Sequence, residues 1–178
     1  MANLAGMDVM KDLLSLVNDG IDGKKIITYL GDIASRETLP DSKYDVITML
    51  GVLSIFDEFE KVLDNAVNML DKKGVLMVFG IFNPEDLDVL IKSRKAGKKE
   101  EVWESGWNYF SKKSMEAYCE EHNLKYEWIS FHFHLDIQKH ENDPLRSWTI
   151  DLPGEQKMIV NGLQLVHHFY LLKITRKL

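Results

Sequence analysis

The feature that most constrains the fold of this chain is the segment "GVLMVF", residues 74–79, which is apolar along its whole length. A strand that is apolar on both faces is typical of a parallel sheet with helices on both sides. The residues before it carry apolar side chains at helical spacing: Phe59, Val62, Leu63, Ala66, Val67 and Leu70. Before that helix comes another strand-like segment, Tyr44–Leu50. Strand, helix and strand at this spacing predict a right-handed crossover unit.

The rest of the chain continues this alternation. We expect two earlier strands, Asn3–Val9 and Lys25–Leu30, with a helix at Met10–Val17 after the first. Asp57 and Glu60 are placed to cap the helix that follows Tyr44–Leu50. Later helices are expected at Glu85–Ser93 and Ser111–His122, and a long hairpin pairs Lys125–Ile137 with Gly162–Thr175. No repeat or low-complexity linker divides the chain, so residues 1–178 form one α/β domain.

Composition limits the classes of function. The chain has 178 residues, of which 45% are hydrophobic and 28% charged, as in globular proteins. Its net charge of -6 argues against a broad nucleic-acid-binding face, and Cys119 is its single cysteine, so no internal disulfide forms. No apolar run approaches the roughly 20 residues of a membrane helix, and no secretory signal is apparent. We therefore expect a cytoplasmic protein with neither nucleic acid nor membrane as partner.

Five segments, in order, resemble the class I S-adenosylmethionine-dependent methyltransferases. "NLAGMDV" and "ITYLGDI" resemble the second and third strands of that family, each closed by an acidic residue. "YDVITMLGVLSIFDEFEKVLDNAVNMLDKKGVLMVFG" resembles the stretch from its fourth strand to its fifth. "YFSKKSMEAYCEEHNLKY" resembles the helix before the sixth strand, and a terminal antiparallel hairpin is typical of the family. The resemblance implies a Rossmann-like, mostly parallel sheet and S-adenosylmethionine as cofactor.

The first strand of that family and its Gly-rich turn have no counterpart before Asn3. We therefore expect an N-terminally incomplete domain, whether a fragment, a truncated form or a relative that has lost a piece. The missing strand is central in the family sheet, so Asn3–Val9 and Tyr44–Leu50 would flank an empty slot. Either these strands pair directly, or a strand of a second copy fills the slot in a homo-oligomer. We expect the chain alone to bind the cofactor weakly and to show no turnover.

By resemblance, five residues bind the cofactor. Asp8 would accept hydrogen bonds from the ribose hydroxyls, with capping of the helix from Met10 onward as the alternative. Asp32 would accept from the adenine amino group and Ile33 would pack on the ring, although Asp32 also suits a turn after Gly31. Leu50 and Gly51 would lie beneath the sulfonium, although a core residue and a turn would look the same.

The acceptor side gives weaker signals. The Asn/Asp-Pro-Pro-aromatic run of amide and adenine methylases is absent, and "MLGVLSIF" stands in its place, which favours a small-molecule acceptor. His134 and His140 follow the predicted sixth strand and are candidate bases. His132, His134, His167 and His168 could in principle bind a metal, but strand faces often carry histidines, so no metal is expected.

Two long segments, Arg94–Phe110 and Gln138–Asn161, carry Trp103, Trp107, Tyr109 and Trp148. We expect both segments to flank one apolar acceptor pocket beside Leu50, Gly51 and Phe82, where the aromatic side chains either form a lid or anchor loops. Two other functions remain open. One is a non-catalytic methyltransferase-like fragment that acts by association. The other is a nicotinamide-dependent oxidoreductase, because Asp8 would suit that ribose too, although the terminal hairpin argues against it.

Overall fold

The computed structural model describes residues 4–17, 26–143, 145–154 and 156–177. The first two strands, β1 (Leu4–Asp8) and β2 (Ile26–Leu30), pair in parallel to form a small sheet of their own. Between them along the chain lies the short helix α1 (Lys11–Ser15). Both predicted strands are confirmed within these bounds, while their predicted first residues, Asn3 and Lys25, lie outside the described residues.

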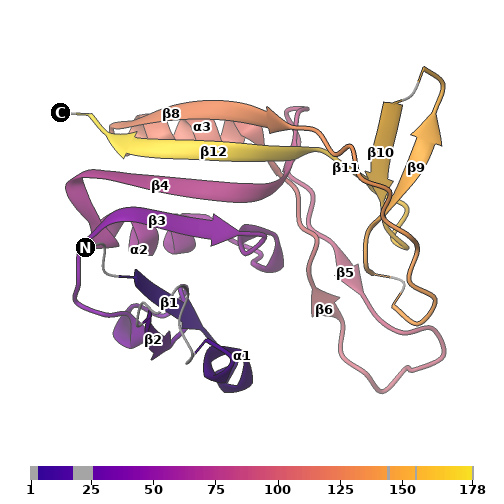
Figure 1. The fold of residues 1–178 in the computed structure, drawn as a ribbon, viewed down its shortest axis with the longest axis horizontal. Helices are drawn as coiled ribbons and strands as arrows, with labels where there is room; N and C mark the ends of the chain where they lie inside the picture. Colours follow the sequence, from indigo (N-terminus) through magenta and orange to yellow (C-terminus); the bar gives the residue numbers. More distant parts are fainter. Residues whose placement is uncertain (1–3, 18–25, 144, 155, 178) are drawn as a thin grey trace.

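The main sheet has the strand order β3-β4-β12-β8, with β7 paired to the end of β4 (Figure 1). Its strands are β3 (Tyr44–Leu50), β4 (Leu70–Asn83), β7 (Phe110–Ser111), β8 (Leu124–Phe131) and β12 (Phe169–Arg176). Strand β3 is parallel to β4, whereas β12 is antiparallel to both β4 and β8. The α/β Rossmann-like sheet with a C-terminal antiparallel hairpin is thus confirmed.

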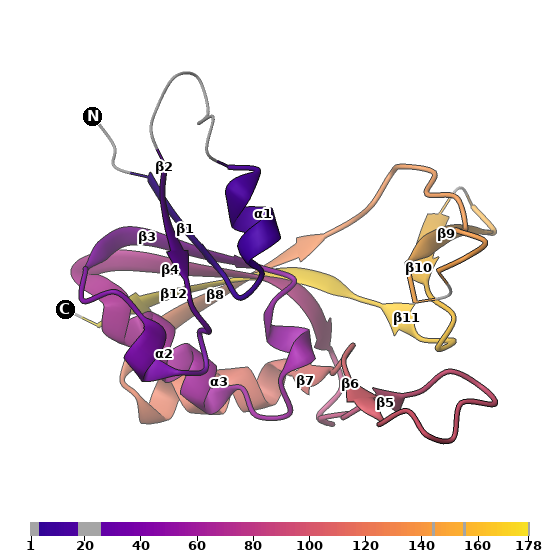
Figure 2. The same ribbon diagram turned by 90° about the horizontal axis from the view of Figure 1, so that it is seen from below.

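Two helices, α2 (Glu60–Met69) and α3 (Lys112–Glu121), lie together on one side of this sheet (Figure 2). The apolar side of α2 includes Val62, Leu63 and Ala66, which are almost completely buried. They belong to the same core cluster as Leu76 and Val78 of β4 and as Leu172 and Ile174 of β12. The helical spacing of these side chains therefore positions α2 over the strand that is apolar on both faces.

The other face of the main sheet carries a chain of aromatic contacts. The ring of Phe79 lies 5.2 Å from that of Phe131 and 5.6 Å from that of Phe169. Phe131 is nevertheless 48% exposed, so this face is only partly covered by the described residues.

Besides the main sheet, the chain forms two short turns and two groups of hairpin strands. Two 3₁₀ turns, η1 (Arg36–Thr38) and η2 (Leu53–Ile55), follow β2 and β3. The segment after β4 forms the hairpin β5 (Lys92–Ser93) and β6 (Glu104–Ser105). The segment after β8 forms β9 (Trp148–Leu152), β10 (Gln156–Val160) and β11 (Val166–His167), which pair in the order β11-β10-β9. Figure 1 shows both groups beyond the same end of the main sheet.

Three sequence predictions are wrong here. Residues 85–93 are not a helix, because the Asn83 side chain bonds the Glu85 amide and the Leu87 carbonyl and so favours a turn. The predicted strand Lys125–Ile137 ends at Phe131, and its partner begins at Phe169, since the connection between them forms its own sheet. Asp57 does not cap α2, whose N-cap is Phe59 with no side-chain hydrogen bond.

The predicted helix at Ser111–His122 is confirmed as α3, capped by the Ser111 hydroxyl.

Strands β1 and β3 do not pair with each other within the described ranges, and each has one unpaired edge. Direct closure of the slot, one of the two expected outcomes, is therefore not observed. No helix among the described residues has the length and apolarity needed to cross a membrane.

Candidate functional site

A cavity of about 550 Å³ lies between the unpaired edges of β1 and β3. Its lining comes from β1 and the residues after it, from the turn after β2, from β3 and from the turn after β3. Strands β1 and β2 are parallel and carry lining residues at or beside their carboxyl ends, whereas β3 lines the cavity from its first residue, Tyr44, to Met49. In open α/β sheets this is the position where ligands bind.

Asp8 is the last residue of β1 and lines the cavity. Its Oδ1 accepts a hydrogen bond of 2.7 Å from the Met10 amide, and its backbone carbonyl accepts one of 3.1 Å from the Gly31 amide. No described residue donates a hydrogen bond to Oδ2. Asp8 therefore does not cap α1, because the N-cap of this helix is Met10, with no side-chain hydrogen bond. One oxygen of Asp8 closes a turn before the helix, and the other is free to accept hydrogen bonds from a ligand.

Asp32 and Ile33 line the same cavity from the turn after β2. The Asp32 carboxylate accepts a hydrogen bond of 2.8 Å from the Ala34 amide, which is the expected Asx turn. The Asp32 amide donates to the Thr38 hydroxyl at 2.9 Å. Gly31 makes this turn possible, since a Cβ atom there would lie 2.8 Å from the Thr38 carbonyl oxygen. The structure thus gathers three of the five predicted cofactor residues, Asp8, Asp32 and Ile33, in one cavity.

Leu50 and Gly51 are not among the residues that line the cavity, although their neighbours Met49 and Val52 are. Leu50 is 66% exposed at the end of β3. Gly51 has a φ of 73°, a left-handed conformation that favours glycine, and its amide donates a 2.8 Å hydrogen bond to the Phe79 carbonyl. This bond fixes the chain direction where β3 ends.

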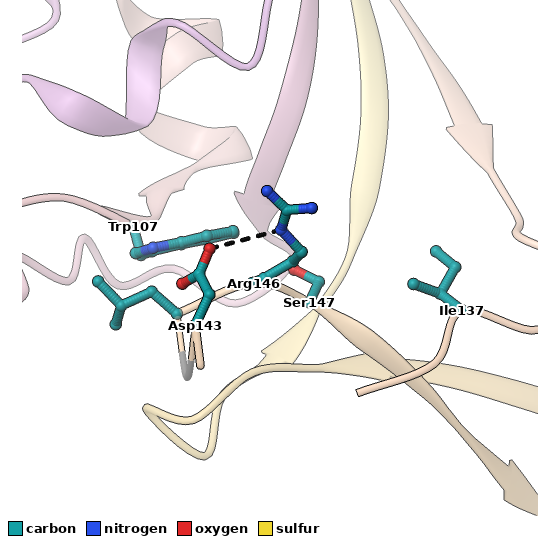
Figure 3. A pocket seen from close by; sticks show the side chains of 6 residues that line it. Trp107, Ile137, Asp143, Arg146 and Ser147 are labelled. Atoms are coloured by element: carbon teal, nitrogen blue, oxygen red, sulfur yellow. Dashed lines mark ion pairs between the residues drawn. The ribbon is translucent and has the colours of Figure 1, made fainter. Parts of the chain in front are cut away.

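A second cavity, of about 480 Å³, lies between the two long segments at the carboxyl end of β4. It is mainly apolar and is lined by Trp107, Ile137, Asp143, Leu145, Arg146 and Ser147. Figure 3 shows the Arg146 guanidinium paired with the Asp143 carboxylate at 3.4 Å beside the Trp107 indole. Both segments do flank one pocket, as expected. The pocket does not adjoin Leu50, Gly51 or Phe82, however, and Phe82 is buried in the core.

The segment that carries Trp107 is fixed by the buried side chain of Asn108. Its amide nitrogen donates to the Phe56 carbonyl at 2.7 Å, and its amide oxygen accepts from the Ile91 backbone at 2.7 Å. Asp57 adds to this anchor by accepting hydrogen bonds from Ser105 and from Lys92. The bond from Ser105, followed by that from Lys92, lowers the pKa of the Asp57 carboxyl. Asp57 therefore holds the segment that carries Trp107 instead of capping a helix.

The histidines divide into exposed and buried ones. His134 and His140 are exposed in the segment after β8 and line neither of the two cavities. His167, in β11, is buried, and its Nδ1 contacts the Tyr109 hydroxyl. Burial lowers the pKa of His167 to about 4. Nothing in the sequence indicated that His167 is buried, because His167 and Tyr109 are 58 positions apart and meet only in the fold.

Comparisons with known proteins agree with this fold. Residues 1–78 match the model of a family described as methyltransferase domain. DhpI, solved as a complex with SAH, aligns with a TM-score of 0.60 and 10% identity over 98% of this chain and 66% of its own. An S-adenosylmethionine-dependent methyltransferase from Clostridium acetobutylicum aligns with a TM-score of 0.57 and 12% identity, over 99% and 76%.

A third similar structure is the Burkholderia thailandensis 1,6-didemethyltoxoflavin-N1-methyltransferase, solved with 1,6-didemethyltoxoflavin and S-adenosylhomocysteine. It aligns with a TM-score of 0.54 and 9% identity, over 97% of this chain and 61% of its own. The chain thus spans less than two thirds of the length of some of the proteins it resembles. No protein of curated function matches it in sequence.

Proposed function

The chain has the Rossmann-like fold of the class I S-adenosylmethionine-dependent methyltransferases, and from that premise we propose that it binds S-adenosylmethionine and serves methyl transfer to a small-molecule acceptor. The observation that carries this proposal is the cavity that gathers Asp8 and Asp32 at the carboxyl ends of two adjacent parallel strands. Two carboxylates on one cavity wall suit a ligand with several hydroxyl and amino donors, as adenosine has.

In the proposed complex, the free Oδ2 of Asp8 accepts hydrogen bonds from the ribose hydroxyls. The Asp32 carboxylate accepts one from the adenine amino group, and the Ile33 side chain packs on the ring. Leu50 and Gly51 lie near the sulfonium at the end of β3. A sulfonium is a good leaving group, so the main task of the protein is to align the acceptor with the methyl group.

For the acceptor side, we propose a small molecule that enters from the carboxyl end of β4, where the two long segments meet. The toxoflavin-type enzyme acts on such a molecule on a similar fold, which supports this choice. His134 and His140 belong to this side and are the proposed bases for an acceptor that must lose a proton. Both are exposed, so each would have to approach the acceptor when it binds.

A titration of S-adenosylhomocysteine followed by methyl NMR tests cofactor binding, because this method detects weak complexes. We expect shifts at the methyl groups of Met7, Ile47 and Met49, which line the cavity. Asp8→Asn keeps an oxygen for the Met10 amide but removes the free acceptor. It should weaken binding by roughly one to two decades, the effect of about 1.5–3 kcal/mol for a charge-assisted hydrogen bond.

The matched control is Asp71→Asn, which changes an exposed carboxylate at the start of β4 outside the cavity lining. It should leave the affinity unchanged. Shifts distributed over the surface with no response at the cavity methyl groups would contradict the proposal, as would an equal loss in both variants.

A second candidate, a non-catalytic methyltransferase-like fragment that acts by association, is favoured by one observation. The facing edges of β1 and β3 are unpaired, and apolar side chains along them are exposed. Cavity shifts without any methyl transfer from S-adenosylmethionine to an added acceptor would favour this second candidate.

A further inference from the structure

The lining of the cavity between β1 and β3 shows that it is a gap between two strand edges. Its walls include consecutive residues of both strands, 5–8 in β1 and 46–49 in β3. Consecutive side chains of a strand point to opposite faces of a sheet, so a cavity over one face would contact only alternate residues. The cavity therefore lies level with the two strands and runs along their edges.

This gap is wide enough for one strand. Opposite Cα atoms of directly paired strands lie about 4.5–5.5 Å apart. Those of β1 and β3 are almost all more than 8 Å from one another, although both strands line one cavity of about 550 Å³. Two strands with a third between them lie at twice the usual spacing of about 4.8 Å, which is roughly 9.6 Å. The separation of β1 and β3 therefore leaves room for an inserted strand.

Both edges of the gap offer backbone groups that have no partner strand. Among the described residues, β1 pairs only with β2 and β3 pairs only with β4. Alternate backbone N–H and C=O groups of each strand therefore point into the gap. Apolar side chains accompany them, since Val46 and Leu50 of β3 are exposed. Open edges of this kind template pairing with another strand.

A second copy of this chain does not offer a strand that fits the gap. An inserted strand needs both of its edges free, whereas every described strand of this chain has at least one edge paired within its own sheet. A second copy could cover β1 or β3 alone, but it could fill the gap only by unpairing a strand of its own. This requirement favours an extended segment of a different polypeptide.

The lining residues define the chemistry of this segment. Strand β3 presents apolar side chains on both faces, because Met49 belongs to the core cluster and Val46, on the opposite face, is exposed. The described lining also contains two carboxylates, Asp8 and Asp32, and no lysine or arginine. A segment that is apolar on both faces and free of acidic side chains therefore complements the gap in shape and charge.

We propose that the gap between β1 and β3 binds an extended apolar segment of a different polypeptide, which pairs with both strands and joins the two sheets into one. A segment of five residues matches the length of β1. This inference goes beyond the proposed function and does not depend on it, because the segment bonds the backbone edges of the strands and not the carboxylates of Asp8 and Asp32.

The test uses a synthetic peptide in which alternating valines and leucines are flanked by lysines at both ends. Amide hydrogen exchange of the unaltered chain is measured at low protein concentration, with and without the peptide. We expect the freely exchanging amides of both β1 and β3 to slow by roughly 100-fold at a free peptide concentration of roughly 100 times Kd. The internal control is β8, which has the open edge at the other side of the main sheet and should not respond.

Two N-methylated forms of the peptide show whether it lies between the strands. Successive amides of a strand point to opposite edges, so methylation of alternate nitrogen atoms blocks hydrogen bonds to one neighbour only. One form is methylated at the odd positions and the other at the even positions. A peptide in the gap uses both edges, so each form should bind about tenfold more weakly. A peptide that covers a single edge would lose affinity in one form only.

The proposal is overturned if the peptide protects neither strand or only one of them, if it protects β8 equally, or if only one methylated form loses affinity. Protection of β3 that rises with protein concentration but not with the peptide would also overturn it, and would assign this edge to a second copy. Every outcome is measured on the unaltered chain and without S-adenosylmethionine. A failed cofactor titration therefore leaves this test interpretable.

Discussion

At the scale of single residues, His167 makes stability depend on pH. Its pKa is lowered from 6.5 to about 4 by burial in the folded state. Between pH 6.5 and about 4, His167 is protonated in the unfolded chain but neutral in the folded chain. The free energy of unfolding therefore decreases as the pH is lowered through this range. Over the middle of this window we expect His167 to contribute up to about 1.4 kcal/mol per pH unit.

Urea unfolding at several pH values measures this dependence. His167→Gln should flatten the curve, because glutamine has no proton to gain, while His168→Gln should keep most of the slope. If the unaltered chain and His167→Gln lose stability in parallel as the pH falls, His167 is not the residue responsible.

At the scale of elements, Asn108, which precedes β7, holds its own segment against the turn η2 and against the residues just before β5. Besides its side-chain bonds to Phe56 and Ile91, its amide donates a 2.8 Å hydrogen bond to the Ser54 carbonyl. Asn108→Leu leaves the partly buried Phe56 carbonyl and Ile91 amide without their side-chain partner. We expect a loss of roughly 2–6 kcal/mol in the free energy of unfolding, at about 1–3 kcal/mol for each group.

Denaturant unfolding gives this loss, and amide hydrogen exchange locates it at residues 83–110. Asn142→Leu, at an exposed position in the other long segment, should change stability little. Similar losses in the two variants would mean that leucine is poorly tolerated in general and that Asn108 is no anchor.

At the scale of the whole molecule, the facing edges of β1 and β3 are the surface through which we expect the chain to self-associate. Val46 on β3 is 55% exposed and Leu4 on β1 is 37% exposed beside unpaired backbone groups. Such edges template pairing with another strand. We therefore expect concentration-dependent self-association in sedimentation equilibrium, in which a strand of a second copy covers β3.

Val46→Lys should shift this equilibrium toward the monomer, because a charge on an edge strand opposes pairing. Val102→Lys is the matched control, since Val102 is exposed in the loop between β5 and β6, away from both edges. A chain that stays monomeric at every concentration, or an equal effect of both variants, would contradict this expectation.

The same open edges border the cavity in which we propose that the cofactor binds. Because the cavity lies between β1 and β3, one side of it depends on whatever covers these edges. We expect the chain alone to bind S-adenosylmethionine weakly, and association to strengthen binding. Titration calorimetry at low and high protein concentration compares the two states, and tight binding by the monomer would refute the expectation.

The sequence alone determined the elements whose residues carry a periodic signal. The apolar run of residues 74–79 and the spacing of Val62, Leu63 and Ala66 predicted β4 and α2, since periodicity reports which face is buried. The sequence also predicted that Asp8 and Asp32 lie at one edge of the sheet, because residues that end parallel strands share that edge, and both line one cavity.

Only the tertiary structure decided the roles that depend on contacts distant in sequence. Asp57 looked like a helix cap, but Ser105, forty-eight positions later, donates to it. His167 resembled the exposed His134 and His140 until the fold enclosed it between Trp107 and Tyr109. Local sequence patterns indicate secondary-structure propensity and which face of a helix or strand is buried. The environment of a single polar side chain depends instead on segments that only folding brings together.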